Sequence, residues 1–377
     1  MRFTLVSNED DDRPVYITGN FNNWKPRDLK FKMFKTGQNT YAIDIDDDKL
    51  PFEIEYKFTR GGWENVEIDE SGNISHNRKT VKSHETVDTV EKWRVNWGPF
   101  KEEFFPTVEI ISEKFYIPQL NRTRKIWALL PYNYHQTNKN YPVLYLQDAQ
   151  NLFNEGSDFG NWEIDKKMSI LAEYGRGDVI IIAIENGRED RIKEYVLNSD
   201  SITDHAEGKK YIRFLADTLK PYVDSVYRTK PEREFTGIGG SSLGGLISIY
   251  SGFLYPEVYS KLLIFSPSLW INPENNFPQM NFGNPYDIKV YMYGGEMEGA
   301  EMTERIELFE KTMEGWEGAH SMQFEFRISI NPEGKHQEFH WSQEFPQAVE
   351  WLFYNTQDDP RELAERAQLE KNDSQQS

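Results

Sequence analysis

Apolar and polar residues alternate with a period of two along the first part of the chain. The alternation is clearest in VYITGNF, TYAIDID and FEIEYKFTR, and turn-forming stretches such as KTGQNT and DESGN lie between such segments. Alternation of this kind places one face of a β-strand in a core and the other in solvent. Helix-length amphipathic runs are absent, so residues 1–95 are predicted to form a small, antiparallel, immunoglobulin-like sandwich.

A second pattern begins near Glu113, where the strand-like runs become almost continuously apolar. The runs YPVLYLQ, DVIIIAIE, KLLIFSP and IKVYMYG are typical of central strands in a parallel sheet covered by helices on both faces. Helix-like stretches such as NWEIDKKMSILAEYG and KYIRFLADTLKPYVDSVY lie between them. Strands that alternate with helices indicate βαβ units, so residues 113–356 are predicted to form a doubly wound α/β domain. Residues 96–112 contain proline and glycine and are predicted to be a linker, and residues 357–377 a polar tail.

Composition excludes several classes of function. A formal charge of −19 over 377 residues repels nucleic acid and anionic membranes, so neither is an expected partner. The absence of cysteine rules out a disulfide framework, a cysteine nucleophile and a thiolate metal site. The sequence shows no secretory signal, and no stretch reaches the roughly 18 apolar residues of a transmembrane helix. A cytoplasmic protein is therefore expected.

One segment of the α/β region has the pattern of a catalytic turn. In EREFTGIGGSSLGGLISIY, a strand run enters a cluster of small residues and a helical run leaves it. Gly240 to Gly244 read G-x-S-x-G with Ser242 at the centre. Small neighbours allow a serine to stand on a sharp strand-to-helix turn, where the helix N-terminus favours developing negative charge. Ser242 is therefore the predicted nucleophile; for Ser241 the trailing glycine is missing because position 243 is leucine.

A general base is expected after the nucleophile, in the chain order serine, acid, histidine. Three histidines follow Ser242: His320, His336 and His340. His336 stands in the loop after the last strand run and is the predicted base, whereas His340, one helical turn on, could support the site or face solvent. A metal pair at these two positions would lack the H-E-x-x-H pattern, so neither a metal nor a cofactor is expected.

The acid is expected directly after the strand run IKVYMYG. Two glutamates stand there, Glu296 and Glu298, and either could accept the Nδ1 proton of His336 and hold its tautomer. The other glutamate then begins the next helix, where an acid suits the helix dipole.

Together these segments resemble the esterase branch of the α/β-hydrolases that includes esterase D, feruloyl and acetyl xylan esterases, enterochelin esterases and mycolyltransferases. The resemblance covers roughly residues 110–355 and rests on YPVLYLQDAQNLF, RIKEY, FTGIGGSSLGGLISIY, FSPSLW and GKHQEFHW. It implies an α/β-hydrolase fold and acyl transfer to Ser242, with His336 as general base and then general acid. The family's acid often stands three residues after a glycine, which favours Glu298 over Glu296 because of Gly295.

The same resemblance implies an oxyanion hole and a substrate pocket. One donor would be the backbone N–H of Leu243, and the other that of Ala149 or Gln150. Relatives often carry glycine where this chain has Ala149, so the second donor departs from the family pattern. A loop at the same edge of the sheet carries three residues that could line the pocket or form a structural ion pair: Arg191, Glu194 and Tyr195.

The first 90 or so residues resemble starch- and glycogen-binding modules of carbohydrate-binding families 20 and 48. In those modules two tryptophans stack on sugar faces, while a lysine and an asparagine bond hydroxyl groups. The matching positions are Trp24, Lys57, Trp63 and Asn77. An aromatic face suits the C–H face of a sugar. The alternative is a platform that binds no glycan but shapes the active-site rim, holds a lid or mediates dimerisation.

Three functions follow from these features. The first is a serine carboxylic ester hydrolase that acts on an acylated carbohydrate or a related small ester. The second is a siderophore trilactone esterase, ranked lower because the sequence shows no distinct arginine or lysine cluster for an anionic chelate. The third is a glycan-binding or scaffold protein with an inactive hydrolase domain, against which the complete set of serine, glutamate and histidine argues.

Overall fold

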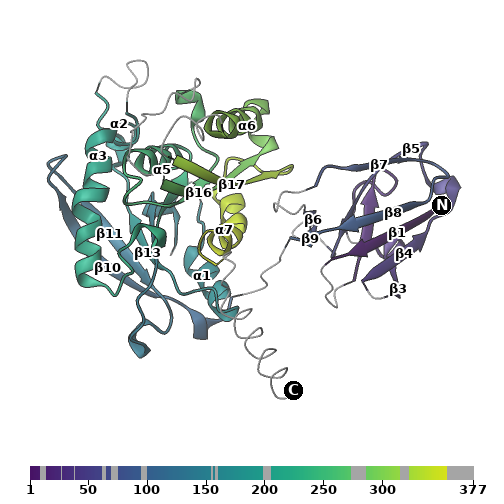
Figure 1. Cartoon of the computed structure of the whole chain (residues 1–377), viewed down its shortest axis with the longest axis horizontal. Helices are drawn as coiled ribbons and strands as arrows, with labels where there is room; N and C mark the ends of the chain where they lie inside the picture. Colours follow the sequence, from purple (N-terminus) through teal and green to yellow (C-terminus); the bar gives the residue numbers. More distant parts are fainter. Residues whose placement is uncertain are drawn as a thin grey trace, which may run out of the picture. The chain divides into compact units, whose positions relative to one another are not determined.

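The chain folds into two compact units in a computed structural model (Figure 1). The structure describes the following residues: 1–8, 14–26, 28–37, 39–61, 65–68, 75–94, 100–153, 156–157, 160–197, 205–272, 286–314 and 322–354. One unit comprises Met1–Trp97 with Arg327–Asn331, and the other Gly98–Phe326 with Pro332–Ser377. In the part of the chain covered by these ranges, no helix is long and apolar enough to cross a membrane.

The N-terminal unit is built from short strands in three sheets. Their orders are β3-β4-β1-β8, β2-β5-β7 and β6-β9. The strands are β1 (Arg2–Ser7), β2 (Tyr16–Gly19), β3 (Phe34–Gly37), β4 (Thr40–Asp44), β5 (Glu53–Thr59), β6 (Glu67–Ile68), β7 (Arg78–Val81), β8 (Thr86–Val90) and β9 (Lys92–Trp93). The pairing is mostly antiparallel, as the sequence predicts, but β1 and β8 run parallel.

The period-two pattern accounts for the core of this unit. In β1, Phe3 and Leu5 are fully buried, whereas Arg2, the first residue of the strand, is exposed. In β5, Tyr56 and Phe58 lie in the same core and their rings meet edge to face, with centroids 5.7 Å apart. Removing such apolar rings from water is the main source of stability for a sandwich of this size.

An eight-stranded sheet has the order β10-β11-β13-β12-β14-β15-β16-β17, and it belongs to the second unit except for the C-terminal half of β17, which is counted with the first. Its strands are β10 (Thr107–Ile117), β11 (Arg122–Leu130), β12 (Val143–Gln147), β13 (Ile180–Ile184), β14 (Thr236–Ser241), β15 (Lys261–Phe265), β16 (Tyr286–Gly295) and β17 (Met322–Asn331). Strands β12 to β16 pair in parallel, and β10 and β11 form an antiparallel edge. This is the mostly parallel, doubly wound sheet that the alternating strand and helix runs predict, and it agrees with the α/β-hydrolase fold that the family resemblance implies.

The main helices of this unit are α1 (Ile164–Glu173), α2 (Arg191–Tyr195), α3 (Gly208–Phe214), α4 (Lys220–Val226), α5 (Leu243–Leu254), α6 (Ala300–Glu314) and α7 (Glu338–Phe353). Successive residues of a strand point to opposite faces of a sheet. In β15, Ile264 faces Gly245 of α5, and Phe265 stacks on Trp162 on the side where α7 packs. Helices therefore cover both faces, which explains why the strand is apolar throughout.

The strand order places a topological switch at β12. The chain leaves β12 for β13 on one side of it and returns to β14 on the other. In open parallel sheets, ligand sites lie at the carboxyl ends of the strands beside such a switch. The residues that follow β12, β14, β15 and β16 are therefore expected to share one edge of the sheet.

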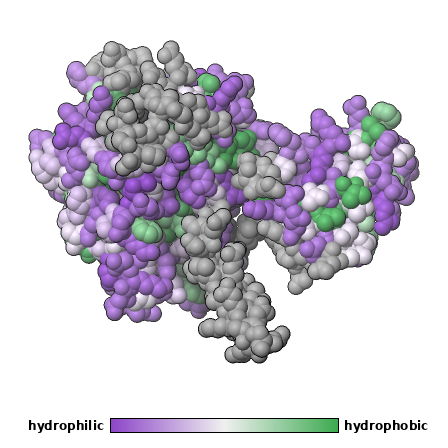
Figure 2. All heavy atoms as spheres, viewed as in Figure 1, coloured by the Kyte–Doolittle hydropathy of each residue, from purple (hydrophilic) through white to green (hydrophobic). Residues whose placement is uncertain are grey.

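On the face drawn in Figure 2, exposed apolar side chains are scattered over a mostly hydrophilic surface.

Candidate active site

Ser242 stands at a sharp turn between β14 and α5. Its φ of +56° and ψ of −122° lie where residues other than glycine are rarely found. Two backbone hydrogen bonds hold this conformation: the N–H of Ser242 donates to Phe265 O at 3.0 Å, and the N–H of Ser268 donates to Ser242 O at 3.1 Å. The structure therefore builds the strained turn that the G-x-S-x-G pattern predicts.

The flanking glycines are required by the close packing of this turn. A Cβ atom added at Gly240 would lie 3.0 Å from the carbonyl carbon of Gly244, and one at Gly244 would lie 2.8 Å from Asp148 Oδ2. Contacts this short between a Cβ and backbone or a fixed carboxylate force a rearrangement. The small residues in the motif thus let the loop after β12 approach the start of α5.

The hydroxyl of Ser242 has a second serine as its partner. Its Oγ lies 3.2 Å from Ser268 Oγ, in the loop that follows β15. Among the described residues, this hydroxyl rather than His336 is the hydrogen-bond partner of Ser242. The sequence segment FSPSLW contains Ser268, but nothing in its pattern singles that residue out from Ser266.

The side chains of His336 and Glu298 are in direct contact. His336 Nδ1 lies 2.7 Å from Glu298 Oε2. The side chain of Glu298 is 2% exposed, and its other oxygen accepts hydrogen bonds from Ser266 Oγ at 2.6 Å and from the Gly295 N–H at 2.9 Å. A carboxylate held in this way accepts a hydrogen bond from the Nδ1–H group, which makes Nε2 of His336 the nitrogen that can act as a base.

The two candidate acids have different surroundings. Glu298 contacts His336, whereas Glu296 is exposed to solvent. Glu296 begins the short 3-10 turn Glu296–Glu298. Of the other two histidines, His340 is half-buried in the first turn of α7 beside Phe339, and His320 lies outside the described residues.

The loops that carry Glu298 and His336 are fastened to each other. The N–H of Met297 donates to Gly334 O at 3.0 Å. A Cβ atom at Gly295 would lie 2.2 Å from that same carbonyl oxygen, so only glycine allows the two loops to approach this closely. The glycine three residues before Glu298 is therefore required at this position because a side chain there would collide with the loop that carries His336.

Trp341 connects this pair to the loop after β15. Its Nε1 donates to Ser266 Oγ at 2.9 Å, and its ring meets the His336 ring edge to face with centroids 5.0 Å apart. Ser266 also donates to Glu298, and the preceding Phe265 accepts from the backbone of Ser242. One continuous set of contacts thus links the Ser242 turn, Glu298 and His336.

The expected oxyanion donors both begin short helical segments. Leu243 is the first residue of α5, and Ala149 is the first residue of the 3-10 turn Ala149–Asn151 that follows β12. Neither N–H donates to a backbone carbonyl among the described residues, as is usual for the first turn of a helix. Gln150 uses its side chain instead, accepting at Oε1 from the Asn186 N–H at 3.1 Å.

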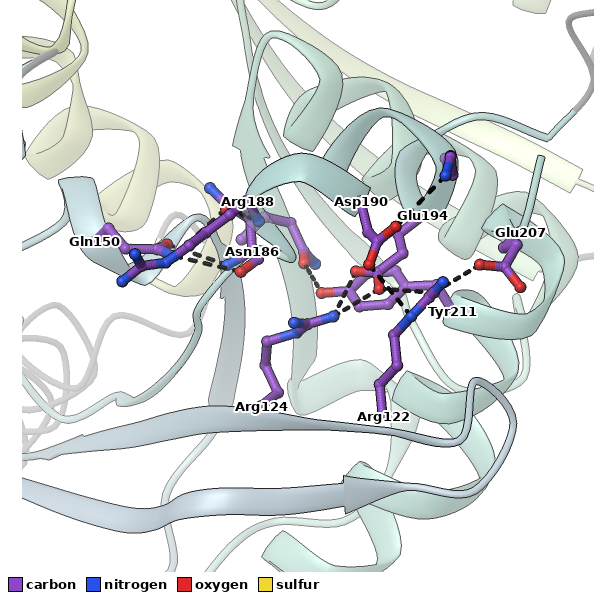
Figure 3. A network of polar contacts seen from close by, with 11 residues as sticks. Arg122, Arg124, Gln150, Asn186, Arg188, Asp190, Glu194, Glu207 and Tyr211 are labelled. Carbon is purple, nitrogen blue, oxygen red and sulfur yellow. Dashed lines mark hydrogen bonds and ion pairs between the residues drawn. The ribbon is translucent and has the colours of Figure 1, made fainter. Parts of the chain in front are cut away.

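The three residues expected either to line a pocket or to form an ion pair are all anchored within the protein. Arg191 makes a two-point contact with Asp148, and Glu194 is fully buried and bonded to Arg122 and Arg124. Figure 3 shows the two arginines reaching toward Glu194. Tyr195 is also fully buried, so neither it nor Glu194 presents side-chain surface to a ligand in this structure. Arg191 and Glu194 thus each belong to an ion pair, but with other partners and not with each other.

The expected glycan-binding residues of the N-terminal unit differ in exposure. Trp24 is half-buried in the turn after β2, and Asn77 is exposed, 3.4 Å from Glu55 Oε2. Lys57 is only 4% exposed, which does not agree with a role in bonding sugar hydroxyls at the surface. Residues Tyr56 to Thr59 are all buried, so β5 does not alternate between core and solvent there. Lys57 is therefore buried although the period-two pattern would place it at the surface. Trp63 lies outside the described residues.

A parallel sheet with a strained serine turn at a strand end, and an acid–histidine pair in the neighbouring loops, defines an α/β-hydrolase. The family model described as "Putative esterase" matches residues 117–352, and the chain belongs to that family. It is a carboxylic ester hydrolase.

Curated relatives match the two parts of the chain separately. The uncharacterized protein YbbA of Bacillus subtilis is 25% identical over 240 residues, which cover 61% of this chain and 92% of that protein. An amylopullulanase of Thermoanaerobacter thermohydrosulfuricus is 38% identical over 91 residues, 22% of this chain and 6% of that enzyme. This second match falls in the N-terminal region, which resembles a carbohydrate-binding module.

Solved structures share the fold at low sequence identity. The siderophore hydrolase EstB from Aspergillus nidulans has a TM-score of 0.53 and 16% identity, and the match covers 66% of this chain and 95% of that one. The enterobactin esterase FES from Shigella flexneri has a TM-score of 0.52 and 12% identity, with 93% and 92% covered. At these identities the likeness establishes the fold alone.

Proposed function

We propose that this carboxylic ester hydrolase works through an acyl-enzyme on Ser242, with His336 as the base and Glu298 as the acid. The observation that carries the proposal is the 2.7 Å contact between His336 Nδ1 and a buried Glu298 carboxylate. This contact orients the imidazole so that Nε2 can serve as the base, and the contacts of Ser266 and Trp341 connect it to the strained serine turn. Acyl transfer requires a serine on a sharp turn, an oriented imidazole and a buried acid.

In the first half of the reaction, Ser242 Oγ attacks the ester carbonyl carbon while His336 Nε2 removes the hydroxyl proton. The tetrahedral intermediate places its negative oxygen near the N–H groups of Leu243 and Ala149. The bond between the carbonyl carbon and the alcohol oxygen then breaks, and His336 returns the proton to that oxygen. Glu298 stabilises the imidazolium that exists between the two transfers.

In the second half, water attacks the acyl carbon of the ester formed with Ser242. His336 again removes a proton, now from water, and then donates it to Ser242 Oγ as the carboxylic acid leaves. Before the first step, Ser242 Oγ must turn from Ser268 toward His336. Hydrogen bonds of unliganded catalytic sites are often looser than those of the reacting complex, so a different partner in the unliganded site is compatible with this step.

We propose an acylated carbohydrate as the substrate. We also propose four segments along the chain: an N-terminal domain of residues 1–95, a linker of residues 96–112, a catalytic domain of residues 113–356 and a tail of residues 357–377. The N-terminal match to an amylopullulanase supports a glycan-directed role, and the two compact units support a boundary near residue 97. The alternative substrate is a siderophore trilactone. It is favoured by one observation, that the enterobactin esterase structure matches 93% of this chain and so spans both units.

A panel of esters distinguishes these two substrates. We expect kcat/KM for acetylated or feruloylated oligosaccharides to exceed that for the catecholate trilactone by about tenfold or more, because specificity is a difference in transition-state binding. The measurement is initial rates with each ester, with product identified chromatographically. Faster cleavage of the trilactone would replace the carbohydrate ester as the proposed substrate.

Glycan binding by the N-terminal unit is tested by electrophoresis in gels that contain starch or glycogen. We expect the wild-type protein to be retarded and Trp63→Ala to migrate as in a plain gel, since one stacking aromatic supplies about 1 kcal/mol or more of contact energy. Trp270→Ala is the matched control, because Trp270 is a 55% exposed tryptophan of the other unit. Wild-type migration as in a plain gel would leave the N-terminal unit as a structural platform, and equal retardation of Trp63→Ala would exclude Trp63 from the glycan site.

A further inference from the structure

A buried carboxylate that the proposed reaction does not use lies between the two expected oxyanion donors. Asp148 directly precedes Ala149, and its Oδ2 is so near the start of α5 that a Cβ at Gly244 would lie 2.8 Å away. Gly244 directly follows Leu243. The Asp148 side chain is 7% exposed, so solvent screens its charge little.

Arg191 of α2 binds this carboxylate at two points. Its Nε donates to Asp148 Oδ1 at 2.7 Å and its Nη2 donates to Oδ2 at 2.9 Å. The side chain of Arg191 is 25% exposed. Burial lowers the pKa of Arg191, but attraction to Asp148 outweighs that effect and raises the pKa above its usual value, so the guanidinium stays charged. A two-point contact of this kind fixes both partners in orientation as well as distance.

From this geometry we infer that Arg191 and Asp148 are positioning residues for the oxyanion hole, and that Arg191 also neutralises the negative charge beside it. The inference rests on the proposed acyl-enzyme function. Without Arg191, the Asp148 carboxylate would stand uncompensated next to the place where the ester oxygen becomes negative. Fixed dipoles and charges aimed at the developing oxyanion have large effects in sites from which water is excluded.

The backbone at Asp148 makes the positioning role concrete. Asp148 has φ +61° and ψ +49°, the left-handed conformation, which turns the chain so that Ala149 begins the 3-10 turn. This conformation is tolerated by aspartate and asparagine but costs energy unless neighbours hold it. Arg191 and Asn186, whose Nδ2 donates to Asp148 Oδ1 at 2.7 Å, provide that support.

The loop is also held from its other side. Gln150 follows Ala149, and its side-chain oxygen accepts from the Asn186 backbone N–H. Figure 3 shows Gln150 and Asn186 facing each other. The expected donor Ala149 is therefore flanked by two residues that are both tied to the segment after β13.

Helix α2, which carries Arg191, has its own anchor. Glu194, one turn after Arg191, is fully buried and accepts hydrogen bonds from Arg124 at 2.6 Å and from Arg122 at 3.1 Å, as Figure 3 shows. Arg122 also donates to Glu207 at 2.6 Å. The guanidinium of Arg191 is thus presented from a helix that strand β11 holds in place.

The test compares Arg191→Met with the double variant Asp148→Asn/Arg191→Met. We expect Arg191→Met to lower kcat for p-nitrophenyl acetate about 100-fold with KM changed less than about threefold, because an oxyanion interaction acts in the transition state. The double variant should recover about tenfold of that loss, since asparagine keeps the left-handed backbone and the Asn186 contact but carries no charge. A purely structural contact would show the loss and the recovery in Tm, with kcat of the folded variants unchanged.

Arg176→Met is the matched control. It removes another partly buried ion pair, with Glu350 at 3.1 Å, and should lower Tm while leaving kcat within about twofold. If Arg191→Met does not fold, Arg191→Lys replaces it, with an expected loss of about tenfold in kcat at unchanged Tm. A kcat within about threefold of wild type for the folded Arg191 variant, or no recovery in the double variant, would overturn the inference. If Ser242→Ala loses activity and the Arg191 variants do not, the positioning role of Arg191 and Asp148 is rejected and the proposed function stands. Full activity of Ser242→Ala would reject the proposed function.

Discussion

Replacing Ser242 with alanine should reduce kcat for p-nitrophenyl acetate by about 10⁴-fold or more, because the hydroxyl that accepts the acyl group is gone. The fold should not change: the turn is held by backbone contacts to Phe265 and Ser268, which alanine keeps. His336→Ala should lose a comparable amount, since the two groups act as a unit. The measurements are steady-state rates and thermal melts of each variant.

Ser241→Ala is the control for this experiment. Ser241 is the last residue of β14, pairs with Phe265 in the sheet and differs from Ser242 by one position. Its activity should stay within about threefold of wild type, as for a small change next to a site. Activity that survives in Ser242→Ala but disappears in Ser241→Ala would move the nucleophile by one residue.

Replacing Glu298 with glutamine should lower kcat by about 10²- to 10⁴-fold, because a neutral amide no longer fixes the His336 tautomer or stabilises its imidazolium. The amide can still accept from Ser266 and the Gly295 N–H, so the loop should remain in place. Rates over a range of pH and thermal melts of the same preparations separate a catalytic effect from an effect on folding.

Glu296→Gln provides a matched comparison, since it is the same substitution two residues away. Glu296 is exposed and should tolerate the change with kcat within about twofold of wild type. The opposite ranking of the two variants would assign the acid to Glu296 and would mean that this loop rearranges when substrate binds.

The sequence pattern predicted the strands of the catalytic unit well because they are buried on both faces. The runs YPVLYLQ, DVIIIAIE and KLLIFSP contain β12, β13 and β15, respectively, and IKVYMYG forms the greater part of β16. Their identity does not depend on distant contacts. The helical run KYIRFLADTLKPYVDSVY was less well predicted, because a π-helical segment, Leu215–Leu219, interrupts it just before Pro221. A proline cannot donate the usual helical hydrogen bond, and local widening of the helix accommodates this.

The parts of the site that depend on tertiary contacts could not be predicted from the sequence pattern. Two glutamates two positions apart look alike in sequence, and the approach of Gly295 to Gly334 selects Glu298 to face His336. Asp148 and Arg191 are 43 positions apart, so no local pattern announces their pairing. Lys57 lies in a strand that departs from alternation, and its burial depends on packing rather than on its own polarity.

The most direct test of the acyl-enzyme is covalent labelling with a serine-reactive phosphonate, followed by identification of the modified residue by mass spectrometry. We expect one phosphonate per chain, on the peptide that contains Ser242, with loss of esterase activity in proportion to labelling and no adduct in Ser242→Ala. Complete inactivation with the adduct on another residue, or full labelling of Ser242 with undiminished ester hydrolysis, would contradict the assignment.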